Sequence, residues 1–227
     1  MLEDGLGYPV RGEWIGRIII GGVLGFFSFL VVPGFVLLGY LYRVLELTVR
    51  GEDTPPQFER WGYLLGKGVG TFAIMVVYAV VPLLVWVAIL TLVVGGILAS
   101  SNGGGAFGGL RVLTVVLMFP VVLFVYWTMP AAISNYAHDG NLGAAFEFSS
   151  IFEVVFTFDY VAATLLPMVV AFVLWVVTFL VAITVVGLLF VPFIQFYGQV
   201  AVIRMFGVAY EARSSKTRDQ TGTTATA

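Results

Sequence analysis

Few side chains in this sequence have both the chemistry and the spacing of a reactive site. Asn135, His138 and Asp139 lie within one short segment, and an imidazole beside a carboxylate is able to bind a metal ion or transfer a proton. A lone histidine beside a glycine is more often a solvated loop residue, and metal sites usually need three or four ligands. We therefore expect no catalytic, cofactor-binding or metal-binding residues.

A second set of polar residues lies inside the last apolar run. Gln195 and Gln199 are one helical turn apart, so they share a helix face. Such residues commonly form hydrogen bonds between helices in a membrane. Together with Asn135 they are also our candidates for an intramembrane polar path. The sequence leaves both roles open.

Two arginines lie near the expected helix ends. The long side chains of Arg43 and Arg204 are able to reach the membrane surface from such positions and bind lipid phosphates. They are our candidate contacts with lipid headgroups.

The residue inventory excludes several classes of protein. The chain has no cysteine, which excludes disulfides, thiolate nucleophiles and cysteine-ligated metals. Its net charge of −2 gives no basic surface of the size that nucleic-acid binding needs. Because no nucleophile elbow, HExxH or nucleotide-binding motif occurs, we do not expect an enzyme.

The elements that must position these residues are membrane helices. The chain of 227 residues is 60% hydrophobic and only 11% charged, against about 25% charged residues in soluble domains. We predict an all-α, polytopic transmembrane bundle formed by residues 1–211, followed by a disordered cytoplasmic tail at 212–227. The five predicted spanning helices cover about 15–47, 68–99, 110–137, 162–185 and 188–210.

The first apolar run is long for one straight crossing. Val32-Pro33-Gly34 interrupts it, and we favour one kinked helix over a tight helical hairpin, which would give six crossings. Two amphipathic stretches, at about 56–66 and 142–157, are predicted to be short helices in the membrane interface. The last two spanning helices are expected to reverse at Val186-Gly187.

Spacing and charge suggest a repeat and an orientation. Proline, glycine and Phe-Glu positions recur with an offset near ninety residues, which predicts an internal parallel repeat. Arginine and lysine are concentrated between the first two helices and after the last one, which places that loop and the C-terminus in the cytoplasm. Five crossings then put the N-terminus outside, and six put it inside.

One pattern resembles a known family. The pattern ends where a glycine-rich segment begins the second apolar run, and it consists of Gly39-Tyr40, Arg43, Gly51, Pro55-Pro56, Phe58 and Trp61. This pattern is similar to that of an archaeal membrane family known as domain of unknown function 4013. The resemblance implies a fold and a membrane location but no reaction, substrate or ligand. Glu59-Arg60 stands where that family would lead us to expect an acidic pair, and the lysine-poor composition would fit a haloarchaeal origin.

The function that we expect from sequence is a membrane scaffold or partner subunit in the cell membrane. Its partners would be membrane lipids and either another membrane protein or a second copy of the chain. The alternative is a carrier or channel for a small molecule or ion, with its polar path near Gln195 and Gln199.

Overall fold

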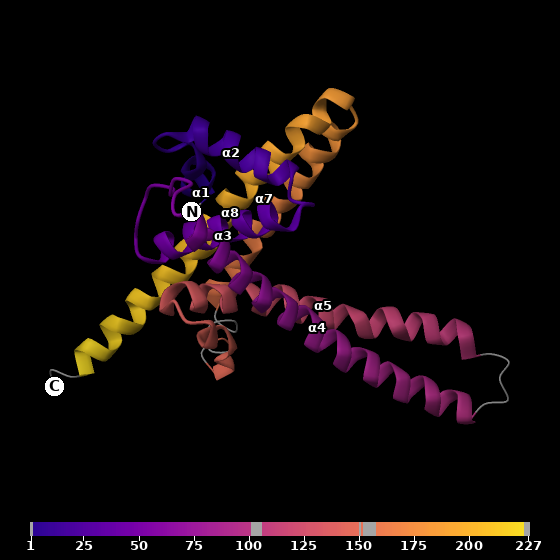
Figure 1. The fold of residues 1–227 in the computed structure, drawn as a ribbon. Helices are drawn as coiled ribbons and strands as arrows, with labels where there is room; N and C mark the ends of the chain where they lie inside the picture. The colour runs from indigo at the N-terminus through magenta and orange to yellow at the C-terminus, as the bar shows by residue number, and fades with distance from the viewer. Residues whose placement is uncertain (1, 101–105, 150, 152–157, 225–227) are drawn as a thin grey trace.

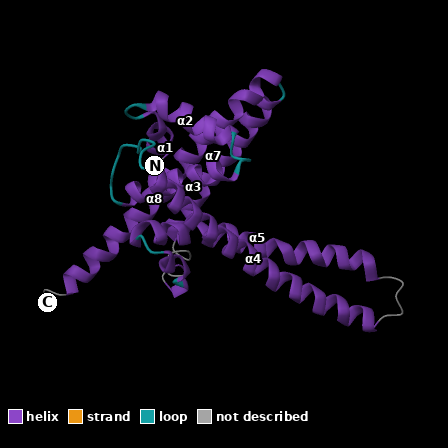
Figure 2. Cartoon of the chain, viewed as in Figure 1, coloured by secondary structure: helices purple, strands orange, loops and turns teal. Residues whose placement is uncertain are grey.

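The computed structural model describes residues 2–100, 106–149, 151 and 158–224, and helix is the only regular structure in them (Figures 1 and 2). Its elements are α1 (Leu2–Gly7), η1 (Tyr8–Val10), α2 (Trp14–Phe26), α3 (Val31–Val49), α4 (Trp61–Ser100), α5 (Ala106–Asp139), η2 (Leu142–Phe146), α7 (Phe158–Ala182) and α8 (Val185–Thr224). Five of them, α3, α4, α5, α7 and α8, are long and apolar enough to cross a membrane. The prediction of an all-α fold with five such helices is confirmed.

The first apolar run is two helices, so the preference for a single kinked helix over 15–47 was wrong. The chain turns at residues 27–30, between α2 and α3, and Pro33 lies in the first turn of α3, where its missing N–H leaves no helical bond unmade. With 13 residues, α2 is about 20 Å long and shorter than a full crossing. The hairpin alternative therefore describes this region.

Helix α3 is the hub of the fold. It packs against α2, α4, α5 and α8, and half of its spanning segment is buried. The other long helices form two hairpins, α4 with α5 and α7 with α8, which diverge from α3 (Figure 1). The core lies at the common base of the two hairpins.

The crossing of α3 and α4 depends on two glycines that face each other. A Cβ atom on Gly39 would lie 1.7 Å from the carbonyl oxygen of Leu64, and one on Gly68 would lie 1.8 Å from that of Phe35. No side chain fits at either position, because the obstacle is backbone on both sides. The two helices therefore approach as closely as their backbones allow.

Two other glycine pairs of the chain have the G-x-x-x-G spacing but different surroundings. Gly21 and Gly25 of α2 face Phe196 and Pro192 of α8, so this G-x-x-x-G pair packs within the chain. Gly62 and Gly66 of α4 form a second pair, and a Cβ on either would meet nothing within 4 Å. The first motif is used internally, whereas the second is open.

The predicted interfacial helix at about 56–66 was wrong. Residues 52–60 are a loop, and α4 begins at Trp61 and continues directly into its spanning segment. Pro55 and Pro56 lack backbone donors, and Arg60 has a left-handed φ of 51°, so the helix cannot extend back through this stretch. Phe58 is buried in the loop, where its ring stacks on Tyr40 with 4.1 Å between centroids.

The second predicted interfacial helix, at about 142–157, is only partly described. Its first residues form the 3₁₀ helix η2, in which the side chain of Asn141 accepts a hydrogen bond from the backbone N–H of Gly143 at 3.1 Å. Residues 150 and 152–157 of the prediction lie outside the described residues.

Two boundaries near the C-terminus differ from the prediction. The reversal falls at residues 183–184 rather than at Val186-Gly187, because the Thr184 hydroxyl caps α8 by accepting from the Gly187 N–H at 2.9 Å. The tail predicted to be disordered at 212–227 continues α8 as far as Thr224. Neither proline nor glycine occurs between Gly207 and Gly222 to stop that helix.

The internal repeat stays a prediction. Gly51 and Gly140, which occupy matching positions in the two proposed copies, both follow a helix end and have positive φ angles of 80° and 71°.

Replacing Gly68 by alanine should weaken the crossing of α3 and α4. The added methyl group meets the Phe35 carbonyl, so we expect a loss of about 3 kcal/mol or more in the free energy of unfolding, at the upper end for overpacking. Thermal unfolding in detergent would measure it. Gly66→Ala is the matched control and should be neutral, and equal melting temperatures for the two variants would refute the backbone contact.

Candidate functional site

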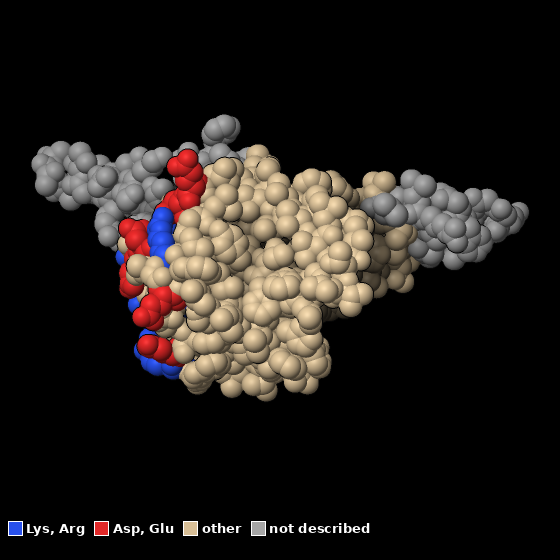
Figure 3. Space-filling view, turned by 90° about the horizontal axis from the view of Figure 1, so that it is seen from above, with Lys and Arg blue, Asp and Glu red and all other residues tan. Residues whose placement is uncertain are grey.

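Charged residues gather at one end of the molecule, as Figure 3 shows. This charged end is formed by the N-terminal segment, the loop at 50–60 and the adjoining ends of the long helices. Its ion pairs include Arg11 with Asp4, Arg43 with Glu46 and Arg204 with Asp53. The hairpins that extend from it are almost entirely apolar.

Arg204 of α8 lies at the centre of this end and is only 4% exposed. Its Nε donates to Asp4 Oδ2 at 3.1 Å, Nη2 donates to Asp53 Oδ1 at 2.6 Å, and Nη1 donates to the Glu52 carbonyl at 2.7 Å. Its guanidinium carbon lies 4.7 Å from the centroid of the Tyr8 ring. The expectation that Arg204 binds lipid headgroups was wrong, because the N-terminal segment folds over it and protein groups occupy its donors.

Arg17 of α2 ties the same segment to the loop. It is 1% exposed and donates from Nη1 to the Pro55 carbonyl at 3.1 Å and from Nη2 to the Pro9 carbonyl at 3.0 Å. Arg11 donates to Asp4 Oδ1 at 2.5 Å and to the Asp53 carbonyl at 3.2 Å. We call Arg11, Arg17 and Arg204 the arginine cluster.

The contacts of the arginine cluster show at which end of the molecule the N-terminal segment lies. It joins the N-terminal segment to α8 and to the loop between α3 and α4, so that segment and this loop lie at the same end of the molecule. An N-terminus on the opposite side, as five crossings would require, does not agree with these contacts. The turn between α2 and α3 is the physical reason for this placement. Because the chain reverses there, the start of α2 and the end of α3 lie at the same end of the molecule.

The electrostatics of Asp4 follow from its two guanidinium neighbours. Burial alone would raise the pKa of its carboxyl, but hydrogen bonds and positive charge from Arg11 and Arg204 outweigh burial and hold the pKa below the ordinary value. Because the folded-state pKa is the lower one, these contacts stabilise the fold above the ordinary pKa and are lost as the pH falls through the folded-state pKa.

Arg43 belongs to a second polar group at the end of α3. Its Nη1 donates to Glu46 Oε2 at 2.6 Å, and the Tyr63 hydroxyl donates to the same oxygen at 2.9 Å. Arg50 donates to the other oxygen of Glu46 at 2.8 Å. The Arg43 side chain keeps 21% of its surface exposed, so lipid contact by Arg43 stays a prediction.

Sequence reasoning missed Lys67 as the link between three helices. Its Nζ donates to the Gly140 carbonyl at 3.1 Å and lies 4.6 and 4.8 Å from the ring centroids of Tyr136 and Tyr42. The attraction between the cation and the rings helps to hold the ends of α3, α4 and α5 together. A lysine six residues after the start of an apolar helix was the available signal.

The three residues of the predicted polar path do not come together. Asn135 of α5 accepts a hydrogen bond from the Tyr210 hydroxyl at 2.8 Å, and Gln195 donates to the Thr178 hydroxyl of α7 at 2.9 Å. Gln199 is exposed. Along α8, Gln195 and Tyr210 are about 22 Å apart. The structure therefore uses Asn135 and Gln195 as separate links between helices.

His138 and Asp139 pair with each other at 2.5 Å on the exposed end of α5. Within the described part of the chain, no group of three histidine or acidic side chains is arranged to hold a metal ion.

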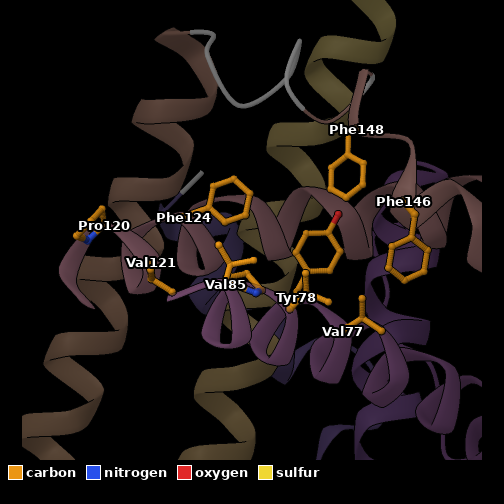
Figure 4. A pocket seen from close by; sticks show the side chains of 10 residues that line it. Val77, Tyr78, Val85, Pro120, Val121, Phe124, Phe146 and Phe148 are labelled. Atoms are coloured by element: carbon orange, nitrogen blue, oxygen red, sulfur yellow. The ribbon is translucent and has the colours of Figure 1, made fainter. Parts of the chain in front are cut away.

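An apolar groove of about 590 Å³ lies between α4 and α5 (Figure 4). One wall is α4, with Val77, Tyr78 and Val85, and the other is α5, with Val121 and Phe124. The rings of Phe146 and Phe148, from the segment that follows α5, lie at one end of the groove. We call this feature the α4/α5 groove.

The geometry so far defines a class of protein, a polytopic helical membrane protein with a charged end and two apolar hairpins. Residues 26–183 match the model of the family described as protein of unknown function (DUF4013), and this chain belongs to that family. No curated protein and no solved structure matches the chain.

Removing the buried guanidinium by Arg204→Gln should release the N-terminal segment. We expect a loss of about 3 kcal/mol in the free energy of unfolding, near the lower end for a broken buried pair, because Asp53 is exposed and regains water. Limited proteolysis within residues 2–13 and thermal unfolding would measure both effects. Arg50→Gln changes an arginine whose own side chain is 56% exposed and whose buried partner Glu46 keeps its bonds to Arg43 and Tyr63, so it should cost less than about 1 kcal/mol. Equal protection in the two variants would contradict the role of Arg204.

Proposed function

We propose that this protein is a membrane scaffold or partner subunit, which holds a transmembrane helix of another membrane protein against its hairpins. The observation that carries the proposal is the separation of the two hairpins. α7 packs chiefly on α8, and only 11% of an 18-residue apolar stretch within the spanning segment is buried in α4, and likewise in α7. In a chain whose own helices complete a bundle, a larger share of each spanning helix is buried.

Two exposed surfaces support this proposal. On α4, Gly62 and Gly66 leave an open face where another helix backbone could approach closely, whereas Gly21 and Gly25 of α2 already pack against α8. On α7, the exposed rings of Phe172, Trp175 and Phe179 stack in a row along the helix. Aromatic residues in spanning helices are enriched at the membrane surfaces, whereas Trp175 lies near the middle of its span.

The carrier alternative has less support. A polar path needs polar groups that converge, and Asn135 and Gln195 instead bind partners on different helices. The proposal includes no enzymatic activity, no cofactor and no nucleic-acid partner. The partner's helix, rather than a second copy of this chain, is the occupant that we propose.

The proposed location is the cell membrane, with the charged end in the cytoplasm. Arg11, Arg43, Arg50 and Lys67 belong to that end, and an excess of such residues is typical of the cytoplasmic side. The C-terminus, which follows Arg204 along α8, would then be cytoplasmic as well. An archaeal, salt-adapted origin is an expectation from composition.

The test is affinity purification after crosslinking in native membranes, followed by mass spectrometry. We expect a membrane-spanning partner in a stoichiometric amount with the native chain. The double variant Gly62→Leu/Gly66→Leu should reduce its recovery about tenfold, because the added side chains keep the helices apart.

Ala79→Leu is the control, since it places a leucine side chain at an exposed position on another face of α4. It should leave recovery unchanged. Recovery of a well-folded chain with no stoichiometric partner, or equal recovery with the double variant, would contradict the proposal. Self-association as the sole product would assign the role to a second copy.

A further inference from the structure

The α4/α5 groove has the dimensions of a ligand site. Its volume of about 590 Å³ falls within the roughly 300–1,000 Å³ of small-molecule pockets. Three separate parts of the chain contribute to it, and its lining side chains face a common space (Figure 4). The groove lies outside the charged end and outside the faces proposed for a partner helix.

The walls of the groove offer no free polar group. The one hydroxyl among its lining side chains, that of Tyr78, donates to the Ala145 carbonyl at 2.7 Å and is fully buried in that bond. The remaining lining side chains are valine, proline and phenylalanine. A ligand that carried charge or hydrogen-bonding groups into this space would lose its water without compensation. Its occupant must therefore be hydrocarbon.

The depth of the groove identifies the source of that hydrocarbon. Along α4, Val77 and Val85 are about 15 Å and 27 Å from Lys67 at the charged end, and the hydrocarbon core of a bilayer is about 30 Å thick. The groove therefore lies at the level of lipid tails. Val81 and Val85 in its wall are 53% and 54% exposed, so the groove is continuous with the lipid-facing surface of α4.

We propose that the α4/α5 groove binds and retains the hydrocarbon chain of a membrane lipid. The chain enters from the side, between the two helices, and packs beneath Phe146 and Phe148. Through that contact the lipid supports the segment that follows α5, in addition to filling the space between α4 and α5. This inference does not depend on the proposed partner.

The test is to count retained lipids after purification in a mild detergent, by native mass spectrometry. The native chain should keep bound lipid, whereas Val121→Phe places a ring in the groove and should lower retention about tenfold. Leu84→Phe adds similar bulk to α4 at a position that is 61% exposed and outside the groove, and it should retain lipid like the native chain.

A second variant covers the case in which Val121→Phe does not fold. Val121→Leu adds one carbon and should lower retention partway while leaving the melting temperature close to that of the native chain. Equal retention in the native chain, Val121→Leu and Leu84→Phe would overturn the proposal. A native chain that retains no lipid would also overturn it, and would assign the groove to another part of this chain or to detergent.

Discussion

The fold depends on the contact between the backbones of α3 and α4 at Gly39 and Gly68. Because no side chain fits at either position, this crossing fixes where α4 leaves the hub. The same close approach brings Lys67, the residue before Gly68, next to Tyr42 of α3. The α4/α5 hairpin is then set at its base by contacts at the charged end, and its outer part is left for lipid or for a partner.

The arginine cluster gives the charged end its second fixed point. It holds α8 and the loop between α3 and α4 together through the N-terminal segment, with most donors of Arg204 and Arg17 bound to backbone carbonyls or carboxylates. These two fixed points lie at one end of the molecule, and the hydrogen bond that joins the two hairpins, from Tyr210 of α8 to Asn135 of α5, lies near the same end, which explains the divergent arrangement in Figure 1. Such a molecule presents apolar surface within the membrane and polar surface on one side of it.

The sequence was sufficient for features that depend on length and apolar character, and insufficient for those that depend on single contacts. The spans were predictable because about 20 apolar residues suit a bilayer whatever their neighbours are. The α2–α3 turn and the start of α4 were missed because proline tolerates both a kink and a first helical turn. The burial of Arg204 depends on Asp4, about 200 residues away, and no local pattern connects them.

The candidate site also contains features that follow from a local sequence pattern and features that depend on single contacts. That Gln195 would bond across helices was one of the roles predicted from its place in an apolar run, but its partner Thr178 was not predictable. Gly62 and Gly66 have the same spacing as Gly21 and Gly25, and only the structure distinguishes an open face from a filled one.

The central claim is that the two hairpins stay apart in the membrane. Since the chain has no cysteine, spin labels attached at Leu123→Cys on α5 and Phe172→Cys on α7 would report their separation in lipid nanodiscs. The account predicts a distance well beyond the roughly 8–10 Å between the axes of packed helices. A short, narrow distance distribution would show that the hairpins close into one bundle and would contradict it.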